Sequence, residues 1–176
     1  MFQDLDYLLA GNERQKKAYQ VISSLNIYDH LNEDSPVLCG TIPIGIDVEG
    51  SDLDIIVEVH DEARYEEKVR RLYGHLDGFT VKHKTIRKFP IVKVNFTYNH
   101  FEFELFAQAE PVKRQYAYLH MIIEHEILKK YPHMKSEIIQ LKKQGYKTEP
   151  AFCYLLRIEG DPYEGLIEYG KEQGFI

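Results

Sequence analysis

The chain has 176 residues, 44% of them hydrophobic and 28% charged, with a formal net charge of −6. A chain of this size and composition can bury one hydrophobic core, so we expect a single compact globular unit. The acidic charge argues against an extended nucleic-acid surface, and the lack of ~18 consecutive apolar residues argues against a membrane span.

The first part of the chain alternates helical and strand patterns. Residues 12–31 have apolar side chains at helical spacing, and residues 37–39 form a short apolar run typical of a buried strand. Residues 40–50 contain three glycines, which indicates a turn-rich loop. Side chains alternate over residues 52–59 as in a strand, and residues 61–76 have the spacing of a surface helix.

The rest of the chain shows strand patterns followed by helical ones. The strands are predicted at residues 79–86, 90–97 and 101–107. The helices are predicted at residues 112–130, 133–144, 148–157 and 161–173. This order predicts an α/β (α+β) fold with a mixed sheet of about five strands, whose flanking helices in the simplest packing cover one side. We expect residues 1–110 to form the core, and residues 111–176 to form a C-terminal helical region within the same compact unit.

Two aspartates at the start of the strand at 52–59 are the most informative residues. Asp52 and Asp54 are two residues apart, so they project from the same face with Cα atoms ~6.5 Å apart. Carboxylates at this range repel one another unless a cation lies between them. Because strands disfavour aspartate and because carboxylate oxygens suit hard cations, we predict a Mg²⁺ or Mn²⁺ site rather than a solvated strand end.

A glycine turn precedes these aspartates. Gly40 and Thr41 follow the apolar strand and offer backbone N–H groups that can hold a phosphate, although the Thr41 hydroxyl could instead stabilise the turn. A metal site beside an anion site is the arrangement that phosphoryl and nucleotidyl transfer require.

This stretch resembles the signature of the nucleotidyltransferase superfamily, in which Gly-Ser, a second glycine and Ser-Asp-x-Asp follow one another at fixed spacing. The matching positions are Gly40, Thr41, Gly45, Ser51, Asp52 and Asp54. The resemblance implies a polymerase beta-like fold and a third carboxylate on a later strand, flanked by apolar residues. We assign this role to Glu104, which precedes Leu105 and Phe106, while Glu102 is an equally spaced rival on the same face.

The chain as a whole resembles the DUF4269 group of bacterial proteins within this superfamily, over roughly residues 12–165. The residues that carry the resemblance lie at 40–47, 51–56, 104–108, 115–121, 147–152 and 160–163. The resemblance implies the fold and the metal site, and it names no substrate.

Two positions depart from the superfamily pattern. Thr41 replaces the usual serine and keeps the hydroxyl. The loop at Ile42–Ile44 lacks the arginine often found there, so a phosphate loop lined by isoleucines would need a cation from elsewhere. The candidates for that cation are Lys82, Lys84, Arg87 and Lys93.

Other polar residues allow two interpretations each. Ser51 either binds the nucleotide or caps the turn before the strand. Lys147 either reaches the nucleotide or begins a helix with Thr148 as its N-cap. His120 and Glu124 share a helix face, where we favour a hydrogen-bonded pair facing a cleft over a zinc site, because no third ligand is evident.

We therefore expect an enzyme that transfers a nucleoside monophosphate from an NTP to a hydroxyl or phosphate acceptor, which could be a small molecule, RNA or a protein. Asp52, Asp54 and Glu104 would be the catalytic metal ligands. Gly40, Thr41, Ser51 and Lys147 would bind the nucleotide. The alternatives are a non-catalytic nucleotide- or protein-binding module of the same fold and a metal-dependent phosphohydrolase.

Two features indicate where the protein acts. Cys39 and Cys153 both stand among apolar neighbours, which is typical of core thiols in a reducing compartment. The acidic residues near the start of the chain are not followed by an apolar run, so we expect no signal peptide and a cytoplasmic protein.

Overall fold

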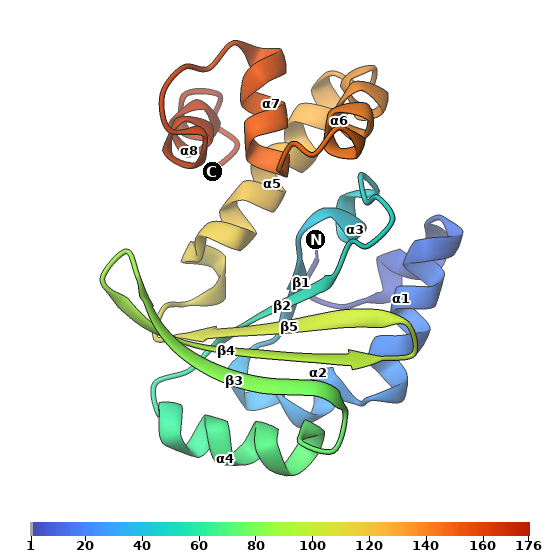
Figure 1. Ribbon diagram of the computed structural model, residues 1–176. Helices are drawn as coiled ribbons and strands as arrows, with labels where there is room; N and C mark the ends of the chain where they lie inside the picture. The colour runs from blue at the N-terminus through green and yellow to red at the C-terminus, as the bar shows by residue number, and fades with distance from the viewer. Residues whose placement is uncertain (1) are drawn as a thin grey trace.

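A mixed five-stranded sheet with strand order β1-β2-β5-β4-β3 lies at the centre of the computed structural model, which describes residues 2–176 (Figure 1). The strands are β1 (Val37–Cys39), β2 (Leu53–Glu58), β3 (Asp77–Ile86), β4 (Phe89–Tyr98) and β5 (Phe101–Gln108). Strands β2 and β5 are parallel, and the other neighbours are antiparallel. The prediction of a mixed sheet of about five strands is confirmed.

One face of the sheet packs against α1 (Glu13–Ser24), α2 (Ile27–His30) and α4 (Glu62–Tyr73). Alternation along β2 and β5 turns Leu53, Ile55 and Leu105 toward these helices, where all three side chains are fully buried. Apart from His83 of β3, which contacts Glu62 and Glu66 of α4, this face presents apolar side chains to the helices, so its main contribution is stability.

The opposite face packs against α3 (Thr41–Ile44) and α5 (Tyr116–Lys130). Helices α6 (Met134–Lys143), α7 (Thr148–Leu156) and α8 (Pro162–Glu172) complete the same apolar cluster by packing on α5 and on one another. Figure 1 shows α5 to α8 on the side of the sheet opposite α4. The expectation that the helices cover one side is therefore wrong. The apolar side chains of Val37, Cys39 and Ile56 leave this second face in need of cover, and the C-terminal helices supply it.

Local backbone geometry explains the other differences. The helix predicted at 12–31 is broken at Asn26, whose φ of 50° is left-handed and separates α1 from α2. The loop predicted at 40–50 contains the single turn of α3, which lies between Gly40 and Gly45 at φ 79° and 69°. Residues 2–176 also contain three short 3₁₀ helices: η1 (Asp6–Ala10), η2 (Asn32–Asp34) and η3 (Val112–Arg114). Within residues 2–176, no helix combines the length and the apolar character that a membrane crossing needs.

Candidate functional site

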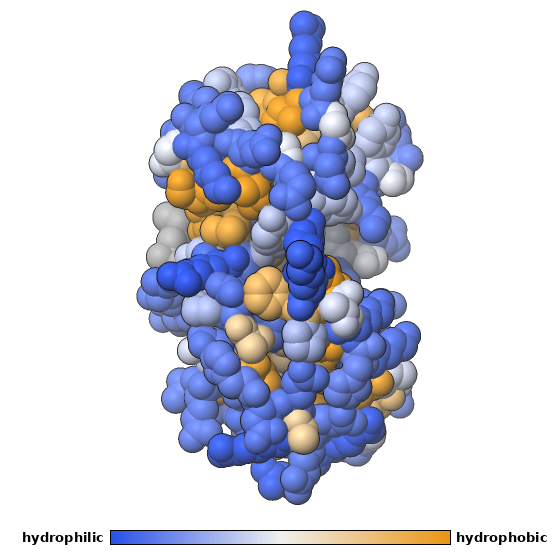
Figure 2. All heavy atoms as spheres, turned by 90° about the vertical axis from the view of Figure 1, so that its left-hand side faces the viewer, coloured by the Kyte–Doolittle hydropathy of each residue, from blue (hydrophilic) through white to orange (hydrophobic). Residues whose placement is uncertain are grey.

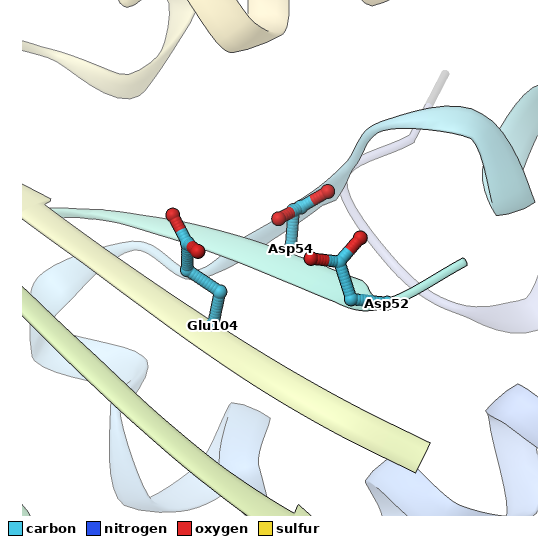
Figure 3. A group of neighbouring side chains, drawn as sticks. All are labelled: Asp52, Asp54 and Glu104. Atoms are coloured by element: carbon cyan, nitrogen blue, oxygen red, sulfur yellow. The ribbon is translucent and has the colours of Figure 1, made fainter. Parts of the chain in front are cut away.

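Three carboxylates meet on the sheet face that looks toward α5–α8. Asp52 immediately precedes β2, Asp54 lies on β2, and Glu104 lies on β5 directly opposite Asp54 in the parallel pairing. One carboxylate oxygen of each residue lies within 4.8 Å of the others, and Figure 3 shows the three side chains converging. The structure thus brings together the three residues that the sequence nominated as metal ligands.

The strand register separates Glu104 from its rival Glu102. Both residues face the same way, but Glu102 pairs with Thr97 of β4 and lies before the first β2–β5 pair, which is Leu53 with Phe103. Its side chain is exposed and is outside the carboxylate cluster.

The negative charges of the three carboxylates are only partly balanced by nearby positive charge. Burial, together with the charges of Asp52 and Glu104, raises the pKa of Asp54 to about 8. Burial and the charge of Glu104 also raise the pKa of Asp52. Lys93 forms an ion pair with Glu104 and partly opposes both shifts. An all-oxygen donor set with surplus negative charge fits a hard divalent cation such as Mg²⁺ or Mn²⁺.

Gly40 brings the turn before α3 against this cluster. Its φ of 79° and ψ of −151° belong to a region that essentially only glycine occupies. A Cβ atom there would lie 2.6 Å from Oδ2 of Asp54. Glycine is therefore required twice, for the backbone conformation and for the close approach to the carboxylate.

Side chains from the start of α1 hold this turn in place. Gln15 is buried and donates from Nε2 to the carbonyl oxygens of Ile42 and Pro43, at 2.9 and 3.1 Å. Arg14 donates to the carbonyl oxygen of Ser51 at 2.9 Å. These contacts link α3 and the loop that follows it to helix α1, so they act as positioning contacts for the site.

Ser51 and Thr41 face each other across the loop, with their hydroxyl oxygens 3.4 Å apart. The Ser51 hydroxyl also accepts from the backbone N–H of Val48 at 2.9 Å, which is the turn-capping role considered for this residue. Both side chains line the cavity described below, so nucleotide binding by Ser51 stays a prediction.

The isoleucines of the loop do not line the cavity described below, contrary to the concern raised by the sequence. Ile42 packs into the core on the α1 side and Ile44 into the core beneath α5–α8. Only Gly40 and Thr41 of this segment border the cavity. Because the loop lacks an arginine, an anion at this turn could be bound only by the backbone N–H groups of the turn and by cations from other segments.

A cavity of about 880 Å³ lies between the sheet and the C-terminal helices. Figure 2 views the molecule from the side of the β3–β4 hairpin and shows apolar side chains gathered between the helices above and the sheet below. The volume is in the upper part of the range of ~300–1,000 Å³ for ligand pockets. We call its two sides the sheet wall and the helical wall. The helical wall is formed by side chains of α5–α8, and the sheet wall by Gly40, Thr41, Ser51, Asp52, Asp54, Ile56, Glu104, Phe106 and Gln108.

The helical wall supplies a cation that the sequence did not reveal. Lys142 of α6 lines the cavity, and within residues 2–176 its only hydrogen-bond partner is Thr148 Oγ1, at 3.2 Å. Burial lowers the pKa of Lys142, while nearby carboxylates, Asp52 among them, oppose this shift. Lys147, the residue nominated from the sequence, is more exposed and stands at the N-cap of α7, so Thr148 is not the N-cap.

Two of the cations that the sequence offered for the phosphates, Lys93 and Arg87, contact other groups instead. Lys93 pairs with Glu104, and Arg87 at the tip of the β3–β4 hairpin contacts Glu164 at 3.2 Å and stacks 4.1 Å above the ring of Tyr116. Of these cations, only Arg87 borders the cavity.

His120 and Glu124 both line the cavity, as expected, but they are not hydrogen-bonded to each other. His120 Nε2 contacts the carbonyl oxygen of Tyr163 at 2.9 Å, and its Nδ1 lies 3.5 Å from Glu149 Oε1. Glu124 is only 3% exposed, and no hydrogen bond within residues 2–176 reaches its carboxyl group. Burial and the charge of Glu149 raise the pKa of Glu124.

The model of a family described as a domain of unknown function (DUF4269) matches residues 20–169. The chain belongs to the DUF4269 family. No curated protein matches this DUF4269 member.

Solved structures share the fold of this DUF4269 protein at low sequence identity. A mutant of the Cid1 poly(U) polymerase bound to MgATP aligns with a TM-score of 0.56 and 16% identity, over 88% of this chain and 54% of that one. The GLD-2/RNP-8 complex gives 0.55 and 13%, over 87% and 61%. A cytoplasmic RNA terminal U-transferase gives 0.52 and 16%, over 74% and 41%. The DUF4269 chain thus has the nucleotidyltransferase fold and spans about half the length of these proteins.

Proposed function

We propose that this DUF4269 protein is a metal-dependent nucleotidyltransferase that transfers a nucleoside monophosphate from an NTP to a hydroxyl or phosphate acceptor. The observation that carries the proposal is the meeting of Asp52, Asp54 and Glu104 beside the Gly40 turn, at the sheet wall of a ligand-sized cavity. The fold shared with proteins such as Cid1, which binds MgATP, supports the same assignment.

Asp52, Asp54 and Glu104 would hold Mg²⁺ or Mn²⁺ through their carboxylate oxygens. When bound, the ion would neutralise phosphate charge and align the reacting groups. Asp54 is more buried than Asp52 and lies against Gly40, which suits it to the donor side. Glu104 lies one strand farther from Gly40, so it would serve the acceptor side and accept the proton of the attacking hydroxyl.

The triphosphate would lie between the Gly40–Thr41 turn and Lys142. The turn offers backbone N–H groups and the Thr41 hydroxyl, while Lys142 offers a half-buried ammonium from the opposite wall. Ser51 and Lys147 border the same space and would add weaker contacts. With the donor held there, the acceptor oxygen would bond to the α-phosphorus as the bond to the bridging oxygen breaks, and pyrophosphate would leave.

The two alternatives use the same residues differently. A non-catalytic binding module drew its support from isoleucines at the phosphate turn, and those side chains are buried away from the cavity. A phosphohydrolase would use water in place of the acceptor hydroxyl. Transfer and hydrolysis would both use the acidic cluster, so only the reaction products can distinguish the two activities.

Thermal shift and label transfer test the proposal together. Each NTP is added with and without Mg²⁺ or Mn²⁺, and at 100 times Kd a specific ligand should stabilise the fold by ~2.7 kcal/mol, or ~5–11 °C in Tm. Labelled NTP is then incubated with tRNA, aminoglycosides and proteins, and both labelled acceptor and released pyrophosphate are measured.

Two carboxyl variants on one strand provide the matched comparison. Glu104→Gln should abolish the metal-dependent shift, whereas Glu102→Gln, on the same face but outside the cluster, should retain it. Equal shifts in the two variants would refute the metal site. Metal-dependent NTP binding without labelled product would favour the binding module, and pyrophosphate release without labelled acceptor would favour hydrolysis.

A further inference from the structure

The outer half of the sheet carries an unusual distribution of charge on the face that bears the carboxylates. Along β3 and β4, Val81, Val92 and Val94 turn toward the core on the α4 side. The alternate positions on the other face include Asp77 at the start of β3, before its bulge, and then three lysines, Lys82, Lys84 and Lys93. We call the three lysines the lysine strip. Such a cluster stands out in a chain whose net charge is −6.

Two of these lysines lie directly opposite each other. Lys82 pairs with Lys93 in the β3–β4 register, which places their Cβ atoms ~4.5–5.5 Å apart, a range at which like charges destabilise a sheet. Lys93 is partly neutralised by Glu104, whereas Lys82 and Lys84 are exposed and form no ion pair within residues 2–176. An anion bound between them would remove this repulsion.

Protection of a sheet edge explains only part of the pattern. Lysines on an edge strand discourage pairing between molecules, and β3 is the edge of this sheet. Lys93, however, lies on the inner strand β4, and edge protection does not require a lysine opposite a lysine. Lys93 has Glu104 as its partner, and the two exposed lysines, Lys82 and Lys84, remain available to an anionic ligand.

The order of the strands places the strip relative to the proposed reaction. Gly40 follows β1, the carboxylates lie on β2 and β5, and the strip occupies β4 and β3, in that order across the sheet. Lys82 is two strands and two residues away from Glu104, a Cα separation of ~12 Å at ordinary sheet spacings. With the donor phosphates at the Gly40 turn, the lysine strip lies on the acceptor side.

We propose that the acceptor carries phosphate, and that the lysine strip binds this phosphate while the acceptor hydroxyl lies at Glu104. The proposal rests on the proposed function, because it assigns the substrate class of that same site. The phosphate could belong to an oligonucleotide or to a phosphorylated small molecule.

Direct binding without NTP or metal tests the strip separately from catalysis. Fluorescence anisotropy with a 5′-labelled RNA octamer is measured across a salt series, and calorimetry compares a hexose 6-phosphate with the plain hexose. The variant is Lys82→Gln/Lys84→Gln, which leaves the Lys93–Glu104 ion pair intact. The control is Lys17→Gln/Lys171→Gln, which removes the same charge from exposed positions on α1 and α8.

The strip variant should bind the phosphate probe more weakly than the control does. If the octamer is the ligand, the slope of log K against log salt should fall by ~1.4, which is ~0.7 for each lost contact to a single strand. Weakened binding of the hexose phosphate alone would assign the phosphate to a small molecule. Identical binding of both probes by the variant, the control and the unchanged protein would overturn the proposal. If the unchanged protein binds a phosphate probe through the lysine strip but is not stabilised by NTP and metal, the proposed function is refuted instead.

Discussion

The sheet wall and the helical wall of the cavity are built in different ways. Gly40, Asp52 and Asp54 of the sheet wall lie within one short stretch of sequence, and strand pairing adds Glu104. The helical wall takes His120 and Glu124 from α5, Lys142 from α6 and Glu149 from α7. A sheet register fixes the first wall, whereas only the packing of helices brings the second together.

This difference predicts how the two walls respond to substitution. Changes in the sheet wall should affect metal binding, because its side chains form the carboxylate cluster. Changes in the helical wall should affect nucleotide affinity or stability and leave the metal response in place. Four substitutions test this division.

Gly40→Ala should have the largest effect. The backbone conformation alone should cost roughly 1–3 kcal/mol, or ~2–12 °C in Tm, and the new Cβ atom would collide with the Asp54 carboxylate. We expect loss of the Mn²⁺-dependent shift in addition to the lower Tm. Gly50→Ala is the matched control, because Gly50 also has a positive φ of 82° but has nothing within 4 Å of its added Cβ. A normal Mn²⁺ response in Gly40→Ala would show that the turn does not govern the cluster.

Asp54→Asn should separate metal binding from stability. The folded protein raises the pKa of Asp54 to about 8, so it holds the proton more tightly than the unfolded chain does. Stability without metal should therefore fall as the pH rises from ~4 to ~8. The asparagine variant removes that loss, and at pH 8 we expect it to be more stable by on the order of 1–2 kcal/mol, or ~2–8 °C.

The same variant should show no stabilisation by Mn²⁺ in thermal denaturation at pH 8. Glu58→Gln, on the same strand and face but outside the cluster, should retain that stabilisation. An Asp54→Asn protein that is less stable than the parent without metal would contradict the repulsion argument.

Much of the sheet wall could be predicted from the sequence because its residues are close together in the chain. The spacing of Asp52 and Asp54 fixes their common face, and the flanking apolar residues favoured Glu104 over Glu102. The helical wall could not be predicted, because no local pattern says which lysine of α6 or α7 turns inward. Lys142 looks like an ordinary surface lysine in the sequence, so Lys147 was chosen instead. The two-sided packing of helices was missed for the same reason.

Lys142→Met tests the helical wall and the choice between these two lysines. A charge-assisted contact to phosphate contributes ~1.5–3 kcal/mol, so NTP affinity should fall ~10- to 150-fold, measured by calorimetry in the presence of Mg²⁺. Lys147→Met should have a smaller effect, because Lys147 is more exposed. The shift produced by Mn²⁺ alone should be unchanged in both variants. If Lys147→Met has the larger effect, the nucleotide does not lie against α6 as proposed.

Glu124→Gln should have the smallest effect and reports on the helical wall alone. Burial, with a further contribution from the charge of Glu149, raises the pKa of Glu124, so the folded protein binds this proton more tightly than the unfolded chain. The free energy of unfolding should consequently fall as the pH rises above ~4.3, the ordinary glutamate value. Glutamine does not titrate, so the variant should match the parent near pH 4 and exceed it by on the order of 1 kcal/mol at pH 8.

Urea denaturation at these two pH values measures the difference, and Glu126→Gln, a more exposed residue of the same helix, is the control. A Glu124→Gln variant that is less stable than the parent at pH 8 would mean that the ionised carboxyl has a partner in the helical wall. Lys142 is the candidate, because its positive charge opposes the raised pKa of Glu124. The Lys142→Met variant should then lose the same stability, whereas without such a partner the two substitutions should have independent effects.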